Sequence, residues 1–364
     1  MKITVGFIGL GLIGGSLAKA IRQFHPDSHI LAYNRSLPVL KAAKSEGVID
    51  EMYSEVDHHF RACDYIFLCT PVSNNIQFMK LLKNYLSSDC ILSDVGSVKG
   101  MIHQQAAELG FSHCFIGGHP MAGSEKTGYE NSKARLLENA YYILTPAENV
   151  NIQKISDYTE LVSSLGAIPL VLTHQEHDYI TAGISHLPHI VAASLVNLVR
   201  ELDTEDEHMK LIAAGGFKDI TRIASSSPDM WQQICLENPE NISQVLDAFI
   251  RMLIQARYLV EQKDAQELYN LFSEARDYRD SIEILPEGPL KKSYILYCDI
   301  ADEPGGIASI ATMLAMEQIN IKNIGIIHNR EFEEGVLRIE FYENSDCEKA
   351  LAILKKRNYI TYTR

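Results

Sequence analysis

The first 172 residues alternate between two hydrophobic patterns. Seven short runs are rich in β-branched and aromatic residues, as strands are, and the segments between them carry apolar residues at helical spacing. Strands that alternate with helices indicate a doubly wound α/β domain, a parallel sheet with helices on both faces. The expected strands are residues 3–8, 29–33, 65–69, 90–94, 115–117, 141–144 and 168–171.

The pattern changes near residue 173. From there to about residue 285 the strand signals vanish and apolar residues recur at helical spacing, which predicts an all-helical domain. Residues 284–289 contain two prolines and a glycine, so we expect a linker there.

The last segment has a β-α-β-β-α-β pattern, typical of a small α+β domain of the ferredoxin-like type. Its expected elements are strands at 294–300, 324–328 and 336–342, helices at 306–317 and near 347–356, and a last short strand. The chain is therefore expected to hold three domains, at 1–172, 173–285 and 290–364.

Composition and charge exclude several kinds of partner. The formal net charge of −14 opposes binding to nucleic acid or anionic lipid. No apolar run is expected to reach membrane-spanning length, and residues 1–8 pass into an amphipathic stretch without a signal-peptide cleavage site. Seven cysteines without a C-x-x-C pair indicate reduced thiols in a cytoplasmic protein.

A glycine-rich turn follows the first strand and opens a helix. Its sequence is Gly9-Leu10-Gly11-Leu12-Ile13-Gly14, the dinucleotide-binding pattern of a Rossmann-type domain. Gly9 permits a tight turn, Gly11 lets the backbone approach a pyrophosphate, and Gly14 allows close helix–strand packing. The helix N-terminus at Leu12 and Ile13 offers N–H groups to the anion. The alternative is a glycine-rich turn that binds nothing.

The end of the second strand bears on the choice of cofactor. The carboxylate that usually binds the ribose is replaced by Asn34-Arg35-Ser36. Asn34 can still bind a ribose, and Arg35 can pair with a 2′-phosphate or stack on adenine, unless it is only a solvated surface arginine. The turn therefore favours NADP slightly and leaves NAD open.

Two further loops are expected along the cofactor. Thr70-Pro71 follows the third expected strand and would lie beside the dinucleotide. Ser97 follows the fourth and would point toward the nicotinamide end.

Four more segments complete a set of motifs. Together with the glycine turn they closely resemble the prephenate dehydrogenase family, from the first strand to about Ser281. The tail, with Asp302-Glu303-Pro304-Gly305-Gly306 after its first strand, resembles an ACT domain, a ligand-sensing module. The four segments are Gly118-His119-Pro120-Met121-Ala122-Gly123-Ser124-Glu125, Glu176-His177-Asp178, Ser185-His186-Leu187-Pro188-His189 and Gly215-Gly216-Phe217-Lys218-Asp219-Ile220-Thr221-Arg222.

The resemblance implies a reaction with defined needs. Prephenate would be decarboxylated oxidatively to 4-hydroxyphenylpyruvate, with hydride passing to NAD(P)+, as a step toward L-tyrosine. A base must take the proton of the C4 hydroxyl, and by resemblance this is His119, whose ordinary pKa lies near working pH. Without the motif, His119 reads as a buried structural histidine.

The resemblance also assigns the substrate-binding residues. Arg222 would bind a carboxylate, and Asp219, one helical turn earlier, would hold its guanidinium in place. Taken alone, this pair reads as a solvated helix salt bridge. Ser97 would contact the nicotinamide and the C4 hydroxyl, His186 and His189 the side-chain end of the substrate, and Glu125 would act as a polar gate.

A metal site is the less favoured interpretation of the histidines. His174, His177, His186 and His189 give two H-x-x-H spacings, but the H-E-x-x-H of a zinc helix is absent and the reaction needs no Lewis acid. No metal is expected.

Two rival functions stay open. An arogenate dehydrogenase would act on a substrate that carries an ammonium in place of the keto group, and Glu125 could face that ammonium. A sensor without activity would bind only nucleotide and amino acid. The resemblance also implies a homodimer through the helical domain, and a tail that senses L-tyrosine through Asp302, Pro304, Gly305 and Gly306.

Overall fold

The computed structural model describes residues 2–123, 126–282, 294–300, 304–327 and 335–363. The chain forms two compact units, Met1–Glu283 and Ile284–Arg364.

A five-stranded parallel sheet is the centre of the first unit. Its order is β3-β2-β1-β4-β5, so the chain moves outward on one side of β1 and then crosses to the other side at β4. That switch point is where open α/β sheets bind ligands, beyond the carboxyl ends of the strands. The strands are β1 (Thr4–Ile8), β2 (His29–Tyr33), β3 (Glu51–Tyr53), β4 (Tyr65–Leu68) and β5 (Ile91–Asp94).

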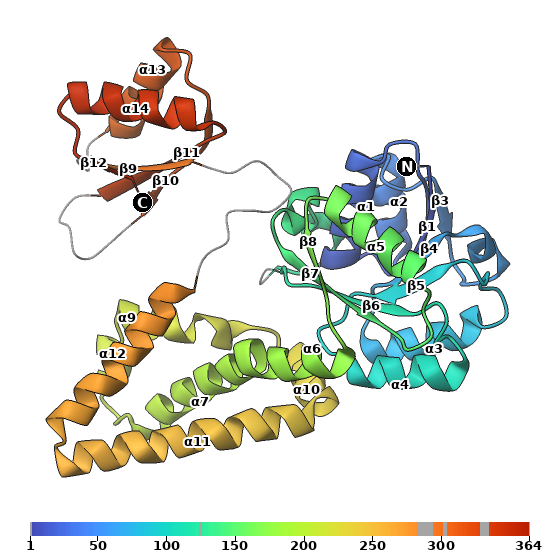
Figure 1. Ribbon diagram of the computed structural model, residues 1–364, viewed down its shortest axis with the longest axis horizontal. Coiled ribbons are helices and arrows are strands. Elements are labelled where there is room, and N and C mark those ends of the chain that lie inside the picture. The colour runs from blue at the N-terminus through green and yellow to red at the C-terminus, as the bar shows by residue number, and fades with distance from the viewer. Residues whose placement is uncertain (1, 124–125, 283–293, 301–303, 328–334, 364) are drawn as a thin grey trace. The chain divides into compact units, whose positions relative to one another are not determined.

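Helices cover both faces of this sheet, as expected (Figure 1). Val5 and Phe7 of β1 pack on one core, and Ile8 packs on the core of the opposite face, because side chains alternate along a strand. The first core includes residues of α1 (Leu12–Phe24), α2 (Leu37–Ser45) and α5 (Ile152–Ser164), and the second residues of α3 (Val72–Leu82) and α4 (Gly100–Leu109).

A second sheet departs from the expected parallel arrangement. Strands β6 (Ile116–Pro120) and β7 (Tyr141–Pro146) are antiparallel, whereas β7 and β8 (Ile168–Val171) are parallel. The reason lies in the connection: residues 121–140 contain two short 3-10 helices, η2 (Tyr129–Asn131) and η3 (Ala134–Leu137), instead of a crossover helix. A parallel bridge between Leu92 and Phe115 links the two sheets.

The rest of the first unit is helical, as expected. The continuous helix His174–Leu202 is by length and composition able to span a membrane, contrary to the expectation that no apolar run reaches that length. Core helices of soluble proteins pass the same test, so one such helix is weak evidence for a membrane span. Within it, η4 (Ala182–His186) is a π-helical turn between α6 (His174–Thr181) and α7 (Leu187–Leu202). The other elements are α8 (His208–Ile212), α9 (Gly215–Thr221), η5 (Arg222–Ser225), α10 (Pro228–Glu237), α11 (Pro239–Gln262) and α12 (Ala265–Ser281).

The second unit is a four-stranded antiparallel sheet with two helices, in the order β10-β11-β9-β12. Along the chain the elements follow the expected β-α-β-β-α-β order. Strand β10 begins three residues earlier than expected, and residue 328, its expected end, lies outside the described residues. The elements are β9 (Tyr294–Ile300), α13 (Gly306–Met316), β10 (Ile321–Ile327), β11 (Gly335–Phe341), α14 (Asn344–Lys356) and β12 (Thr361–Thr363).

Candidate active site

The glycine turn has the geometry that its motif requires. Gly9 has a φ of +101°, and a Cβ there would lie 2.7 Å from Thr70 Cγ2. A Cβ on Gly14 would lie 2.5 Å from the carbonyl oxygen of Gly9, so α1 packs too closely for any side chain. A Cβ on Gly11 would meet open space, so the start of α1, where the N–H groups of Leu12 and Ile13 lie, is open to an anion.

The turn after β2 is tied to the glycine turn. Asn34 Oδ1 accepts from the backbone N–H of Leu10 at 3.3 Å, and Asn34 Nδ2 donates to the carbonyl of Ser36 at 3.4 Å. Arg35 is exposed, and Ser36 is the N-cap residue of α2. Asn34 thus orders the turn on which the expected cofactor-binding residues lie.

The loops after β4 and β5 lie at the same edge of the sheet. Asn75 Oδ1 accepts from the backbone N–H of Thr70 at 3.1 Å and from its hydroxyl at 2.6 Å, and Pro71 precedes the first residue of α3. Ser97 is half-buried in the loop between β5 and α4.

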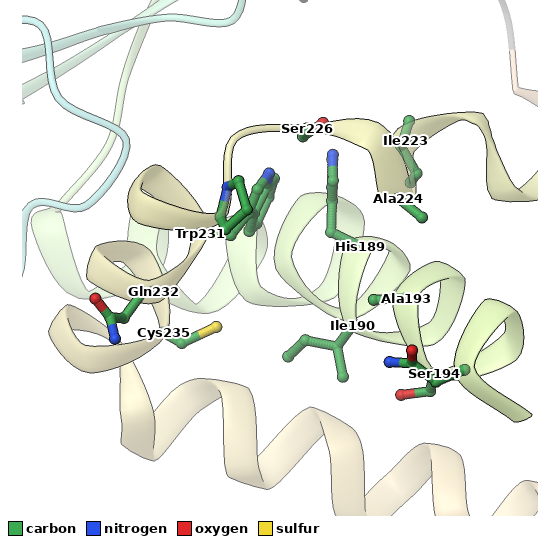
Figure 2. Close-up of a pocket in the computed structure, with 12 residues that line it drawn as sticks. His189, Ile190, Ala193, Ser194, Ile223, Ala224, Ser226, Trp231, Gln232 and Cys235 are labelled. Carbon is green, nitrogen blue, oxygen red and sulfur yellow. The ribbon is translucent and has the colours of Figure 1, made fainter. Parts of the chain in front are cut away.

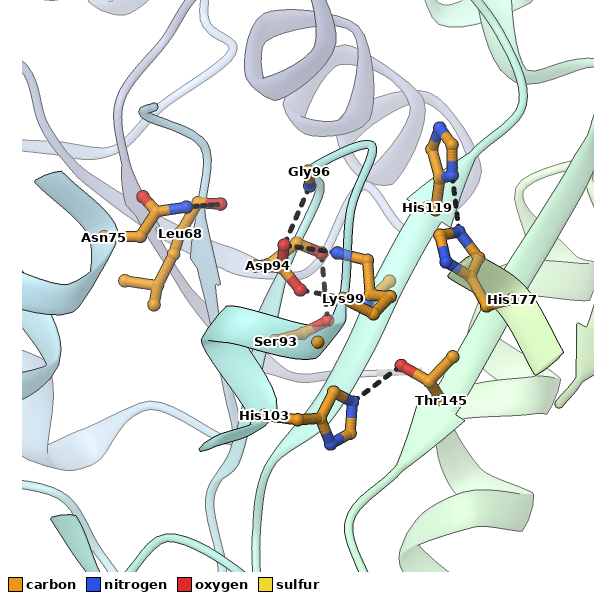
Figure 3. A network of polar contacts seen from close by, with 12 residues as sticks. Leu68, Asn75, Ser93, Asp94, Gly96, Lys99, His103, His119, Thr145 and His177 are labelled. Carbon is orange, nitrogen blue, oxygen red and sulfur yellow. Dashed lines mark hydrogen bonds and ion pairs between the residues drawn. The ribbon is translucent and has the colours of Figure 1, made fainter. Parts of the chain in front are cut away.

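A fully buried ion pair stabilises the loop that carries Ser97 (Figure 3). Lys99 Nζ lies 2.5 Å from Asp94 Oδ2, and both side chains are 0% exposed. Asp94 also accepts from the backbone N–H of Gly96 at 2.8 Å and of Gly118 at 3.3 Å. The carboxylate therefore joins the Ser97 loop to the strand that carries His119.

His119 is the first member of a buried hydrogen-bonded chain (Figure 3). Its Nδ1 lies 2.7 Å from Nε2 of His177 on α6. His177 Nδ1 in turn lies 2.7 Å from Asp178 Oδ1. Asp178 in turn accepts from the backbone N–H groups of Lys99 at 2.8 Å and Gly100 at 2.7 Å. This series of hydrogen bonds connects the helical region to the β5–α4 loop and to β6.

The surroundings favour a neutral imidazole and an ionised carboxylate. Burial, with the neighbouring His177, Lys99 and His186, lowers the pKa of His119 well below its ordinary value. Burial alone would raise the pKa of Asp178, but hydrogen bonds from His177 and from the backbone of Lys99 outweigh it and lower that pKa. His119 is therefore uncharged at neutral pH, which leaves one ring nitrogen without a proton.

His186 ends the π-helical turn, and His189 follows it in the first turn of α7. Burial lowers the pKa of His186 to about 4, and its Nδ1 lies 3.3 Å from the amide nitrogen of Asn238. The ring of His189 stacks on Trp231, with 3.7 Å between the ring centroids. His189 and Trp231 line a cavity of about 400 Å³, shown in Figure 2, whose walls include Ile190, Ser226 and Cys235. The ring of His186 contacts Trp231, with 6.1 Å between the ring centroids.

Three expected substrate-binding residues remain: Arg222, Asp219 and Glu125. Arg222 is exposed and near enough to His189 for its charge to lower the histidine's pKa, although burial is the larger cause. Asp219 is also exposed, and α9 ends at Thr221, so Asp219 and Arg222 are not on one uninterrupted α-helix. Glu125 lies outside the described residues.

The tail's expected sensor loop is described only in part. Gly305 has a φ of +95° and precedes α13, whose first residue is Gly306. Pro304 is exposed, whereas Asp302 lies outside the described residues.

Several functional-site residues were not anticipated. Asp94, Lys99, His177, Asp178 and Asn238 all belong to the polar network, yet no role was expected for them. The segment Glu176-His177-Asp178 is one of the four motif segments, and Asp94 ends an apolar strand, so the sequence carries a signal for both. Among the described residues, the group that could hold a metal ion is Asp57, His58 and His59, which stand in η1 (His58–Ala62) and just before it.

Known proteins resemble this chain over nearly all its length. Family models of the prephenate dehydrogenase nucleotide-binding domain and dimerization domain match residues 17–170 and 173–274. Prephenate dehydrogenase of Bacillus subtilis is 40% identical, over 98% of this chain and 97% of its own length.

Solved structures with a similar fold cover more than three quarters of this chain. The A. aeolicus prephenate dehydrogenase in complex with hydroxyphenyl propionate and NAD+ has a TM-score of 0.73 and 32% identity, over 78% of this chain and 99% of that chain. Synechocystis arogenate dehydrogenase has a TM-score of 0.71 and 29% identity, over 77% of this chain and 100% of that chain.

Proposed function

The chain belongs to the prephenate dehydrogenase family, and from that premise we propose how its residues carry out the reaction. The enzyme is an NAD(P)-dependent oxidoreductase that converts prephenate to 4-hydroxyphenylpyruvate and CO₂. The observation that carries the residue assignment is the placement of the half-buried His119. Its strand is held to the Ser97 loop by Asp94, and its ring is hydrogen-bonded to His177.

His119 is the base. A nicotinamide dinucleotide held at the Gly9–Gly14 turn would supply the acceptor for the hydride that leaves C4 of the substrate. His119 accepts the proton of the C4 hydroxyl as that carbon is oxidised, which the lowered pKa of His119 permits at neutral pH. Departure of the ring carboxylate as CO₂ sends an electron pair into the ring, and the phenolate oxygen takes the proton back. Ser97 orients the hydroxyl toward His119.

The substrate's anionic groups are bound from the helical side. Arg222 binds a carboxylate through its planar guanidinium, with Asp219 near it on α9. His186 and His189 contact the side-chain end of prephenate, and Glu125 is a polar gate. The proximity of Arg222 to His189 and the cavity beside His189 support this assignment.

The cofactor is a nicotinamide dinucleotide, and we propose that NADP is accepted at least as well as NAD. Gly9, Gly11, Leu12, Ile13 and Gly14 hold the pyrophosphate. Asn34, Arg35 and Ser36 face the ribose, with Thr70, Pro71 and Ser97 along the rest of the cofactor. The exposed Arg35 and the absence of a carboxylate from this turn support NADP.

We propose that the enzyme is a cytoplasmic homodimer. The helical region matches the dimerization domain, and in the single chain α7 and α11 expose large apolar residues. All seven cysteines are free thiols, as a reducing compartment requires. The apolar residues include Leu198, Leu202, Ile250 and Leu253.

L-tyrosine is the proposed effector of the tail. Two features support this proposal. The tail is a small domain with the expected topology, and its helix α13 begins at Gly306, directly after Gly305. By the sequence motif, Asp302 and Pro304 are proposed to take part with these glycines.

The second candidate is arogenate as substrate, which the similarity to Synechocystis arogenate dehydrogenase favours. Purified protein is assayed with prephenate and arogenate, each with NAD+ and NADP+. Turnover of prephenate with either cofactor supports the proposal. Turnover of arogenate but not of prephenate would show that the enzyme is an arogenate dehydrogenase. Activity with neither substrate would favour a sensor without enzyme activity.

A further inference from the structure

In the reaction proposed above His177 only holds His119 in place and Asp178 has no part, yet both are buried behind the base. His177 is 0% exposed and Asp178 is 4% exposed. We propose that His177 and Asp178 are positioning residues that fix the tautomer of His119, so that His119 Nε2 is the bare acceptor that faces the substrate. This inference rests on the proposed role of His119 as the base.

The argument begins at Asp178, whose carboxylate is held at both oxygens. The backbone N–H of Lys99 donates to Oδ1, and the N–H of Gly100 donates to Oδ2. An ionised carboxylate can only accept hydrogen bonds. The contact of 2.7 Å between Asp178 Oδ1 and His177 Nδ1 therefore requires the proton of His177 to be on Nδ1.

The proton on His177 Nδ1 decides the state of the next ring. A neutral imidazole carries one N–H, so Nε2 of His177 is a bare acceptor. Its partner at 2.7 Å, His119 Nδ1, must then donate, which leaves Nε2 of His119 bare. The reverse arrangement would place a bare His177 Nδ1 against the buried carboxylate, where two acceptors repel each other.

The same hydrogen bonds stabilise the positive charge that forms on His119 during the reaction. When His119 accepts the hydroxyl proton at Nε2, its Nδ1–H donates more strongly to His177, and His177 Nδ1–H donates to the carboxylate of Asp178. No proton needs to pass to Asp178. Lys99 and His186 also face His119, and Lys99 and Asp94 face His177. These neighbouring groups are unchanged in the His177 variants, so differences between those variants arise from residue 177.

Two substitutions at His177 separate positioning from packing. His177→Leu removes the acceptor, whereas His177→Gln retains an amide oxygen that can accept from His119 Nδ1. We expect kcat of His177→Leu to fall roughly 10- to 10²-fold, the usual cost of losing a group that orients a functional ligand. KM for prephenate and cofactor affinity should stay within about threefold, and His177→Gln should recover most of kcat.

The pH profile supplies a readout that packing does not move. Without the acceptor the His119 imidazolium is less stable, so its pKa falls further and the acid limb of the kcat profile moves to lower pH. His103→Leu is the matched control, because His103 is a buried imidazole bonded to Thr145 at 2.8 Å rather than to His119. This control should leave the acid limb in place.

Three outcomes would overturn the inference: a His177→Leu variant with wild-type kcat and acid limb, equal impairment of the glutamine and leucine variants, or a loss matched by His103→Leu. If the leucine variant does not fold, ¹⁵N spectra of histidine-labelled wild-type and His119→Asn protein decide the tautomer, and a proton on Nε2 of neutral His119 refutes the inference. A fully active His119→Asn protein would instead refute the proposed function.

Discussion

The buried pair Lys99–Asp94 gives a prediction whose size follows from the structure. Both side chains are fully buried and 2.5 Å apart, and Lys99→Met removes the charge that compensates Asp94. Two backbone N–H groups, of Gly96 and Gly118, would remain on the carboxylate. Breaking a buried pair on one side costs about 3–5 kcal/mol, because the other charge stays buried without a partner.

This loss should be measurable by unfolding. For a unit of this size each 1 kcal/mol lowers Tm by roughly 2–4 °C, so Lys99→Met should lower Tm by about 6–20 °C, with a matching fall of the urea midpoint. Lys210→Met is the control, because Lys210 is exposed in a surface pair with Glu207 and should leave both midpoints unchanged.

The double variant Asp94→Asn/Lys99→Met tests the cause. It removes both charges, so it should lose less stability than Lys99→Met alone if the uncompensated carboxylate is responsible. A Lys99→Met protein as stable as the Lys210→Met control would refute the reasoning.

Four further results are expected. His119→Asn should lower kcat roughly 10²–10⁴-fold with cofactor affinity little changed, and near-wild-type turnover in steady-state assays would contradict the base assignment. Arg222→Ala should raise KM for prephenate at least about tenfold, since a charge-assisted bond contributes roughly 1.5–3 kcal/mol; a fall in Tm alone would indicate a structural ion pair. Arg35→Ala should weaken NADP binding more than NAD binding in titrations, whereas equal losses point to adenine stacking. A chain ending at residue 284 should stay active and lose tyrosine inhibition; undiminished inhibition would exclude the tail as the sensor.

The sequence predicted the elements well where a local pattern decides them. The runs at 29–33, 168–171 and 294–300 became β2, β8 and β9 with the expected bounds, because alternating or continuous apolar residues determine a strand locally. Strand β3 was missed because Glu51–Tyr53 is three residues long and lies at the sheet edge. The antiparallel pairing of β6 with β7 was missed because strand direction depends on the connection, and hydrophobic patterns do not encode it.

The site was predictable in its motifs and not in its contacts. Gly9 and Gly14 occupy the positions that their spacing implied, since backbone geometry at a tight turn is a local property. His177 is 58 residues from His119 along the chain, and Gly118 is 24 residues from Asp94. Contacts over such separations arise from the tertiary fold. The sequence therefore showed motifs that contain these residues, but it did not show which residues contact each other.

Lys99 connects these two long-range contacts. Its side chain pairs with Asp94, which holds the strand of His119 through Gly118, and its backbone N–H binds Asp178, which holds His177. The base is therefore fixed from the sheet on one side and from the helix His174–Leu202 on the other. The same helix continues into the exposed apolar residues of α7 that the proposed dimer would cover. A shift of this helix would move His177 and with it the hydrogen bond that orients His119, so assembly of the helical region and alignment of the base depend on one element.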